Sequence, residues 1–203
     1  HGISRPPTQR VLIIPVLYCR TLDVIGDKDL ARRTWDTMMR FMAFFFSDRG
    51  NGILERDGNG DGLIEAGTSS DPGGLSPGLL IQQAMDETGY DDLPVYSGGS
   101  TSNRLGLLAE GVEFDWASQC LTVNLIGQNS LYCASCNAML VWAERLGKDD
   151  DAKWLRAEAK RISDRIKEQL YCGEDGFFRD RYWNGKFSPV KAMTIFYPLL
   201  AGI

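Results

Sequence analysis

Two helix–turn–helix segments with nearly the same turn constrain the fold of this chain more than any other feature. The first turn is I-G-D-K at residues 25–28, and the second is L-G-K-D at residues 146–149. A glycine ends a helix readily because it adopts the left-handed conformation at no steric cost, and such a short turn makes the flanking helices antiparallel neighbours. The two turns lie much farther apart than the ~34 residues of a tetratricopeptide repeat. We therefore predict an all-α fold, an α/α toroid with long inserted loops.

Four long helices are expected on either side of these turns. Apolar residues at helical spacing predict helices over residues 8–25, 28–47, 121–146 and 148–170. Thr8 and Asp27 are the expected N-caps of the first two helices, and Pro15 is expected to kink the first. Tryptophans at helical spacing are predicted to lie in the core: Trp35, Trp142 and Trp154.

The rest of the chain has a less regular pattern. A region rich in glycine, serine and aspartate extends over residues 48–115, broken by a helical patch at 79–85. A loop of this length inside a compact domain is uncommon unless it has a function. Farther along, residues 173–187 contain the aromatic pairs Phe177-Phe178 and Tyr182-Trp183, with Phe187 after Asn184-Gly185, and this predicts a small β-hairpin that turns there.

Histidine is almost absent, and this excludes several kinds of catalytic site. The only histidine is His1. A Ser-His-Asp or Cys-His nucleophile needs a positioned imidazole, and a histidine-rich zinc centre needs several. Acid–base chemistry in this chain must therefore use carboxylates, as glycoside hydrolysis does. A net charge of −5 without a basic run argues against nucleic acid as a partner, and no apolar stretch is long enough to span a membrane.

The cysteines are expected to be structural. Cys133 and Cys136 form a C-x-x-C pair, but no second pair or histidine supplies further zinc ligands. The pair lies inside a long apolar periodic segment. We therefore predict small core residues here, not a redox or metal site.

A glycine-rich acidic loop is a candidate metal site. Residues 57–65, D-G-N-G-D-G-L-I-E, place oxygen-bearing side chains at alternate positions with glycines between them. Calcium takes roughly six to eight oxygen ligands, and a D-x-[DN]-x-[DN]-G loop supplies three side chains and one backbone carbonyl. The pattern is similar to an EF-hand loop but incomplete, because Thr68 stands where that loop carries its distal glutamate. We predict a structural calcium whose remaining ligands come from elsewhere in the fold. The alternative is a solvated Gly/Asn/Asp turn.

A second acidic segment, E-T-G-Y-D-D-L-P at residues 87–94, is the candidate catalytic site. A general acid must hold its proton near neutral pH, and burial among apolar groups or a neighbouring negative charge achieves this. Glu87 and Asp92 supply negative charge near Asp91, and Tyr90 and the leucine after Asp92 supply apolar cover. The alternative interpretation is an acidic surface turn.

This segment resembles the E-S-G-x-D-[DN]-x-P signature of glycoside hydrolase family 63, which includes processing α-glucosidases and bacterial mannosylglycerate hydrolase-like enzymes. Weaker matches follow the family's order along nearly the whole chain, at residues 4–7, 26–28, 48–49, 56–57, 146–148, 175–178 and 197–203. The resemblance implies an (α/α)6 barrel and hydrolysis of an α-glycosidic bond with inversion. It implies an oligosaccharide or a small glycoside, an α-glucoside or α-mannoside, as the substrate.

The resemblance also implies roles for particular residues. Asp91 falls on the family's general acid. The calcium ligands of a bacterial relative fall on Asp57, Asn59, Asp61, the carbonyl of Leu63 and Asn124. Asn124 replaces a glutamate of that relative, which implies weaker calcium binding; Arg5 and Thr88 also depart from the family pattern. The predicted substrate contacts are Glu87, Asp92 and the rings of Tyr90 and Trp116, which would stack on sugars.

The second carboxylate that inversion requires is not identified. It activates water about 6.5–9.5 Å from the acid. Glu110, Glu113 and Asp115 lie in the same loop region, but none matches the family's base. We therefore expect residues 1–203 to be part of a single (α/α)6 catalytic domain, truncated at both ends. Such a piece is expected to be inactive alone and to expose apolar helix faces.

Two other functions stay open. One is a non-catalytic, calcium-stabilised α-toroid that binds carbohydrate or acts as a scaffold. The other is a different α-toroid carbohydrate enzyme, such as a debranching-type glucosidase. The compartment is also open, since unpaired cysteines favour a reducing interior and a calcium loop favours the outside.

Overall fold

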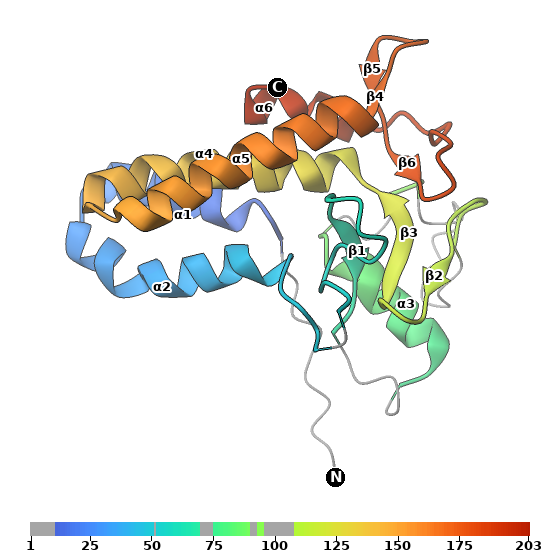
Figure 1. The fold of residues 1–203 in the computed structure, drawn as a ribbon, viewed down its shortest axis with the longest axis horizontal. Coiled ribbons are helices and arrows are strands. Elements are labelled where there is room, and N and C mark those ends of the chain that lie inside the picture. Colours follow the sequence, from blue (N-terminus) through green and yellow to red (C-terminus); the bar gives the residue numbers. More distant parts are fainter. Residues whose placement is uncertain (1–10, 51, 70–74, 90–92, 96–107) are drawn as a thin grey trace.

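Four long helices form the main body of the fold, arranged as two hairpins (Figure 1). The computed structural model describes residues 11–50, 52–69, 75–89, 93–95 and 108–203. The first hairpin consists of α1 (Ile14–Ile25) and α2 (Lys28–Phe44). The second consists of α4 (Ile126–Leu146) and α5 (Asp149–Gln169), which lie side by side, and α1 packs against α4. The predicted helical hairpins are confirmed.

Both hairpin turns have the chemistry expected from their glycines. Gly26 and Gly147 each have a φ of 68°, in the left-handed region, and they end α1 and α4. Asp27 then caps α2, because its carboxylate accepts from the N–H groups of Asp29 and Leu30 at 2.9 and 2.8 Å. Such a cap typically stabilises a helix by about 1 kcal/mol. The N-cap residue of α5 makes no such bond, and three aspartates in the first turn of α5 complement the helix dipole instead.

Some helix boundaries differ from the prediction. α1 begins at Ile14, so Pro15 lies in its first turn, where a missing N–H costs nothing; the predicted kink is wrong. The predicted cap, Thr8, lies outside the described residues. α2 ends at Phe44, and the short predicted helix is α3 (Pro77–Asp86). Within the described part of the chain, no helix is both long and apolar enough to cross a bilayer.

The larger apolar core lies between the two hairpins. Trp35 of α2 is fully buried, and its Nε1 donates to Oδ2 of Asp151 on α5 at 2.7 Å, which ties the hairpins together. Trp142 is buried as predicted. Trp154 is 38% exposed, so its predicted core position is wrong. The buried face of α5 follows a different set at helical spacing, Ala152, Leu155, Ala159, Ile162 and Ile166.

Both cysteines of the C-x-x-C pair lie in this core. Cys133 and Cys136 are buried on α4 and form no disulfide. Burial raises the pKa of the Cys133 thiol to about 11, which keeps it in the unreactive protonated form. Their predicted role as core residues is confirmed.

A small antiparallel sheet lies at one end of the helical body (Figure 1). Its central strand β3 (Cys120–Asn124) pairs with β1 (Glu65–Gly67), β2 (Phe114–Asp115) and β6 (Arg181–Tyr182). Helix α3 packs on β1 and β3. The contact forms a second, smaller apolar core that includes Leu80, Ala84, Met85, Leu121 and Val123.

The strand β3 contradicts the predicted start of a helix at residue 121. The apolar residues of β3 extend the apolar pattern of α4 toward the N-terminus, so the two segments read as one helix in the sequence. Helix α4 begins only at Ile126. Its partners β1 and β6 come from distant parts of the chain. Local periodicity cannot show such partners, and pairing with them decides the conformation of this segment.

Two small hairpins and two short helical segments follow α5. The predicted turn at Asn184-Gly185 is confirmed, because Arg181 and Phe187 pair across it and the Tyr182 N–H donates to the Lys186 carbonyl at 2.9 Å. The other elements are β4 (Tyr171–Cys172) paired with β5 (Phe177–Phe178), the 3-10 helix η3 (Met193–Phe196) and α6 (Pro198–Ala201).

An aspartate from this C-terminal region caps α4. The N-cap residue Leu125 has no polar side chain, and Oδ1 of Asp180 accepts from the Ile126 N–H at 2.7 Å instead. Burial raises the pKa of Asp180 to about 6, against the opposing effects of this hydrogen bond and of Arg179. The cap holds the segment after β5 against the junction of β3 and α4.

Candidate functional site

The glycine-rich loop folds its acidic side chains toward one point. Asp57, Asp61 and Glu65 each offer a carboxylate oxygen, and these oxygens all lie within 4.8 Å of one another. Two ligands on opposite sides of a calcium ion, each 2.3–2.6 Å from it, would be about 4.6–5.2 Å apart. The spacing of the three carboxylates therefore suits a calcium-sized cation.

Hydrogen bonds within the loop fix this arrangement. Oδ1 of Asn59 accepts from the Asp61 N–H at 3.0 Å, and Oδ1 of Asp61 accepts from the Leu63 N–H at 2.9 Å. Oδ2 of Asp57 accepts from the Gly62 N–H at 3.1 Å. Gly62 has a φ of 85°, which permits the tight turn that this bond closes. The alternation of oxygen-bearing residues and glycines in the sequence thus produces a compact acidic loop.

Several buried oxygens at this point lack a hydrogen-bond donor. Among the described residues, Oδ1 of Asp57, Oε1 of Glu65 and Oδ1 of Asn124 are buried without a partner. Burial raises the pKa of Asp57, and burial together with the charges of Asp61 and Asp57 raises the pKa of Glu65 well above its usual value. A buried acceptor without a donor is costly. A cation bound among these oxygens would remove that cost.

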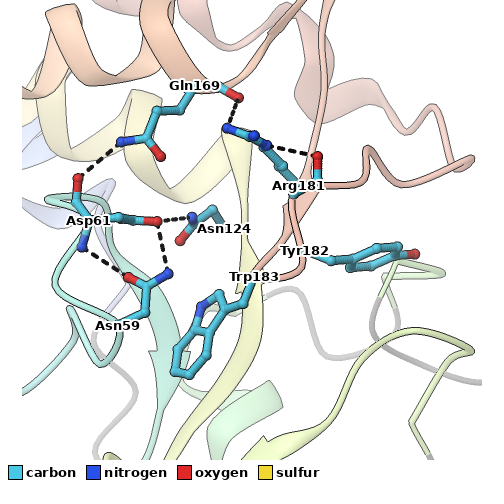
Figure 2. A pocket seen from close by; sticks show the side chains of 8 residues that line it. Asn59, Asp61, Asn124, Gln169, Arg181, Tyr182 and Trp183 are labelled. Atoms are coloured by element: carbon cyan, nitrogen blue, oxygen red, sulfur yellow. Dashed lines mark hydrogen bonds between the residues drawn. The ribbon is translucent and has the colours of Figure 1, made fainter.

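The sheet brings Asn124 to the loop. Asn124 on β3 lies directly across from Glu65 on β1, so the two side chains project on the same face of the sheet. Nδ2 of Asn124 donates to Oδ2 of Asp61 at 2.6 Å, and Nε2 of Gln169 at the end of α5 donates to the Asp61 carbonyl at 3.0 Å. Figure 2 shows Asn59, Asp61 and Asn124 converging in this way.

The predicted ligands therefore meet, and one further ligand candidate appears. The sequence interpretation named Asp57, Asn59, Asp61, Asn124 and the carbonyl of Leu63, and the structure places all of them in or against this loop. It did not name Glu65. The sequence did contain a sign of Glu65 as a ligand, because the alternate positions that carry the predicted ligands continue from residue 63 to residue 65.

A polar pocket of about 200 Å³ lies beside the loop (Figure 2). Its walls come from the loop, from β3, from the end of α5 and from the hairpin that begins with β6. The lining residues are Asn59, Asp61, Asn124, Gln169, Arg181, Tyr182, Trp183 and Gly185. The pocket leaves one side of the candidate metal site open to small molecules or water.

The start of the acidic segment is held by a buried ion pair. Glu87 follows α3 directly, and its side chain receives two hydrogen bonds from Arg56, with Nε to Oε2 at 2.5 Å and Nη2 to Oε1 at 2.6 Å. Arg56 is fully buried and Glu87 is 3% exposed. Burial lowers the pKa of Arg56, but Glu87, together with Cys120 and Glu55, raises it by more in total, so the guanidinium stays charged. The predicted acid Asp91 and its neighbours Tyr90 and Asp92 lie outside the described residues.

Trp116, the predicted sugar platform, lies in the turn between β2 and β3. It is 54% exposed and packs edge-to-face on Phe114 with 4.8 Å between ring centroids. The turn is held by Arg49, which donates to the Ser118 carbonyl and to Oε1 of Gln119. Gln119 has a φ of 57°, an uncommon conformation for a residue other than glycine. The exposed ring suits stacking on a sugar, and its substrate role stays a prediction.

Known proteins support both the fold and the family. A family model described as the mannosylglycerate hydrolase MGH1-like glycoside hydrolase domain matches residues 10–203. The structure is similar to that of a glycoside hydrolase family 63 mannosylglycerate hydrolase from Thermus thermophilus in complex with glucose, with a TM-score of 0.64 and 18% identity. It is also similar to an uncharacterized conserved protein from the same organism, with a TM-score of 0.64 and 16% identity. No significant match was found among curated proteins.

These structural matches also show how much of each solved structure corresponds to this chain. They cover 100% and 99% of this chain but 48% and 49% of the two solved chains. The chain thus spans about half the length of the structures that it resembles. Together with its helical hairpins, this confirms the predicted partial α/α toroid.

Proposed function

This chain belongs to the mannosylglycerate hydrolase MGH1-like glycoside hydrolase family, and we propose that the protein hydrolyses an α-glycosidic bond with inversion, with Asp91 as the general acid. The expected substrate is an α-glucoside or an α-mannoside. The observation that carries the proposal is the family match over residues 10–203, which includes both the acidic segment and the glycine-rich loop.

The proposed reaction consumes one water molecule. Asp91 gives its proton to the glycosidic oxygen while the bond between that oxygen and the anomeric carbon breaks. A second carboxylate takes a proton from water, whose oxygen forms the new bond to the anomeric carbon from the opposite face. The sugar leaves with inverted configuration, and proton exchange with solvent restores both carboxyl groups. We propose that the second carboxylate comes from the part of the barrel that lies outside this chain.

We also propose that the loop at residues 57–65 holds a structural calcium. Asp57, Asn59, Asp61, Glu65 and Asn124 would be the side-chain ligands, with the Leu63 carbonyl beside them. All of these donors are oxygens, which calcium prefers. When bound, the ion would neutralise the buried carboxylates and fix the loop to β3.

Calcium is expected to raise the melting temperature, and Glu65→Gln is expected to abolish most of this effect. A ligand present at 100 times its Kd stabilises the folded state by about 2.7 kcal/mol. For a domain of this size, this raises the melting temperature by on the order of 5–10 °C. Thermal unfolding with calcium and with a chelator measures the shift. Without calcium the variant is expected to melt no lower than the parent, because it removes a buried carboxylate that lies close to the carboxylates of Asp57 and Asp61.

Asp164→Asn is the matched control for the calcium experiment. Asp164 is an exposed carboxylate on α5 that pairs with Lys160, far from the loop in sequence. Its replacement removes the same charge and is expected to leave the calcium-induced shift unchanged. An equal shift in the parent and in Glu65→Gln would contradict the proposed ligand set.

The function is tested by an activity screen of the full natural protein. Hydrolysis is measured on a panel of α-linked glucosides and mannosides, and the anomeric form of the released sugar is followed by NMR. Release of the β-anomer from an α-glycoside would support the proposal, and release of the α-anomer would refute inversion. A protein that folds and binds calcium but cleaves no member of the panel would favour the carbohydrate-binding or scaffold function.

A further inference from the structure

We propose that the Arg56–Glu87 ion pair positions the segment that carries the general acid by anchoring it to the glycine-rich loop. The sequence predicted a sugar contact for Glu87, whereas the geometry points to a positioning role. The inference rests on the proposed role of Asp91, and it adds two residues that act on the reaction through that carboxyl group.

The Glu87 carboxylate is engaged and out of reach of solvent. Both of its oxygens accept from the Arg56 guanidinium in a bidentate arrangement, and Oε2 also accepts from the Gly67 N–H at 3.3 Å. Bidentate pairs of this kind fix orientation as well as distance. Since Glu87 is buried, its carboxylate can hold protein segments together but is poorly placed to receive a sugar hydroxyl.

Arg56 is fixed independently of Glu87. Its N–H donates to the Phe45 carbonyl, and its carbonyl accepts from the Glu65 N–H, both at 2.9 Å. Its guanidinium also lies over the ring of Phe44, 5.0 Å from the centroid, and donates through Nη2 to Ser69 Oγ at 3.0 Å. Arg56 is therefore a rigid anchor at the base of the loop, immediately before Asp57.

The other end of the pair connects to the acid. The Glu87 N–H continues the bonding of α3 by donating to the Gln83 carbonyl at 3.0 Å, so Glu87 lies at the end of a fixed helix. Asp91 follows it by four residues. The ion pair thus anchors the chain shortly before the proposed acid, on its N-terminal side. An error of about 1 Å in the position of a catalytic group can lower a rate on the order of 10²-fold.

The test compares two substrates in the full natural protein. One is an α-glycoside with an alkyl or sugar leaving group, which needs protonation, and the other is the matching α-glycosyl fluoride, which needs little acid assistance. For Glu87→Gln we expect kcat to fall by roughly 10–100-fold on the glycoside but within about 2-fold on the fluoride, with KM little changed. Arg56→Lys, which keeps the charge but loses the bidentate contact, is expected to show the same pattern more weakly.

Glu55→Gln is the matched control. Oε2 of Glu55 pairs with Nη1 of Arg56 at 3.1 Å, whereas Glu87 is bound through Nε and Nη2. The substitution perturbs the same arginine and is expected to change both substrates equally or not at all. A raised KM for Glu87→Gln with unchanged kcat would show a substrate contact and overturn the inference. An equal loss on both substrates, or no loss, would also overturn it.

Asp91→Asn separates this inference from the function on which it rests. If Asp91→Asn loses activity on the glycoside but not on the fluoride, while Glu87→Gln and Arg56→Lys do not, only the positioning role is wrong. If Asp91→Asn itself shows no such selectivity, the proposed general acid is wrong and the positioning role is refuted with it. Should Glu87→Gln fail to fold, Arg56→Lys provides the same comparison.

Discussion

Replacement of Asp91 by Asn is expected to lower kcat on an unactivated α-glycoside by about 10²–10⁴-fold, with little change in KM. An amide has the shape of the carboxyl group but cannot give a proton to the leaving oxygen, and general acids contribute about this factor. A loss in kcat with KM unchanged indicates an interaction made only in the transition state. Steady-state kinetics of the full natural protein measure both constants.

Asp86→Asn is the control for this prediction. Asp86 is the last residue of α3, five positions before Asp91, and its Oδ1 accepts from Gln82 Nε2 at 2.6 Å. The same chemical change there is expected to leave kcat within about 2-fold, since surface and near-surface substitutions mostly have small effects. An Asp91→Asn enzyme with the activity of the parent would place the acid elsewhere.

Replacement of Trp35 by Ala is expected to lower the free energy of unfolding by about 3–5 kcal/mol. The side chain is fully buried between the hairpins, so its removal leaves a large cavity. The substitution also removes the donor to Asp151 that links α2 to α5. Urea unfolding monitored by circular dichroism measures the difference.

Two further tryptophan variants divide this effect into its parts. Trp35→Phe keeps much of the buried ring and loses the hydrogen bond, so a cost of about 1–3 kcal/mol is expected. Trp154→Ala removes a partly exposed ring from the neighbouring hairpin and is expected to cost less than Trp35→Ala. Equal costs for Trp35→Ala and Trp154→Ala would contradict the observed core.

The helical hairpins could be predicted because their signals are local. Gly26 needs only its own backbone freedom to end α1, and Asp27 caps α2 with residues two and three positions away. The strand β3 could not be predicted in the same way, because its conformation depends on partners up to about 60 residues away along the chain. The cap of α4 by Asp180 is non-local for the same reason.

The candidate site shows the same difference between local features, which could be predicted, and non-local ones, which could not. The loop at 57–65 was recognisable from alternating oxygens, and the placement of Asn124 beside it came from a family resemblance that strand pairing now explains. The pairing of Glu87 with Arg56 was not foreseen, because two charged residues 31 positions apart give no sign in the sequence that they meet. The assignment of Asp91 still depends on the resemblance.

The short segment around Glu65 passes from one apolar core to the other. Leu63 and Ile64 belong to the apolar core of the helical hairpins, whereas Ala66 belongs to the core beneath the sheet. A cation held by Asp57 and Glu65 would therefore lie at the boundary between two hydrophobic clusters. By holding this boundary it would make the two clusters unfold as a single cooperative unit, and without the ion they would be free to unfold separately.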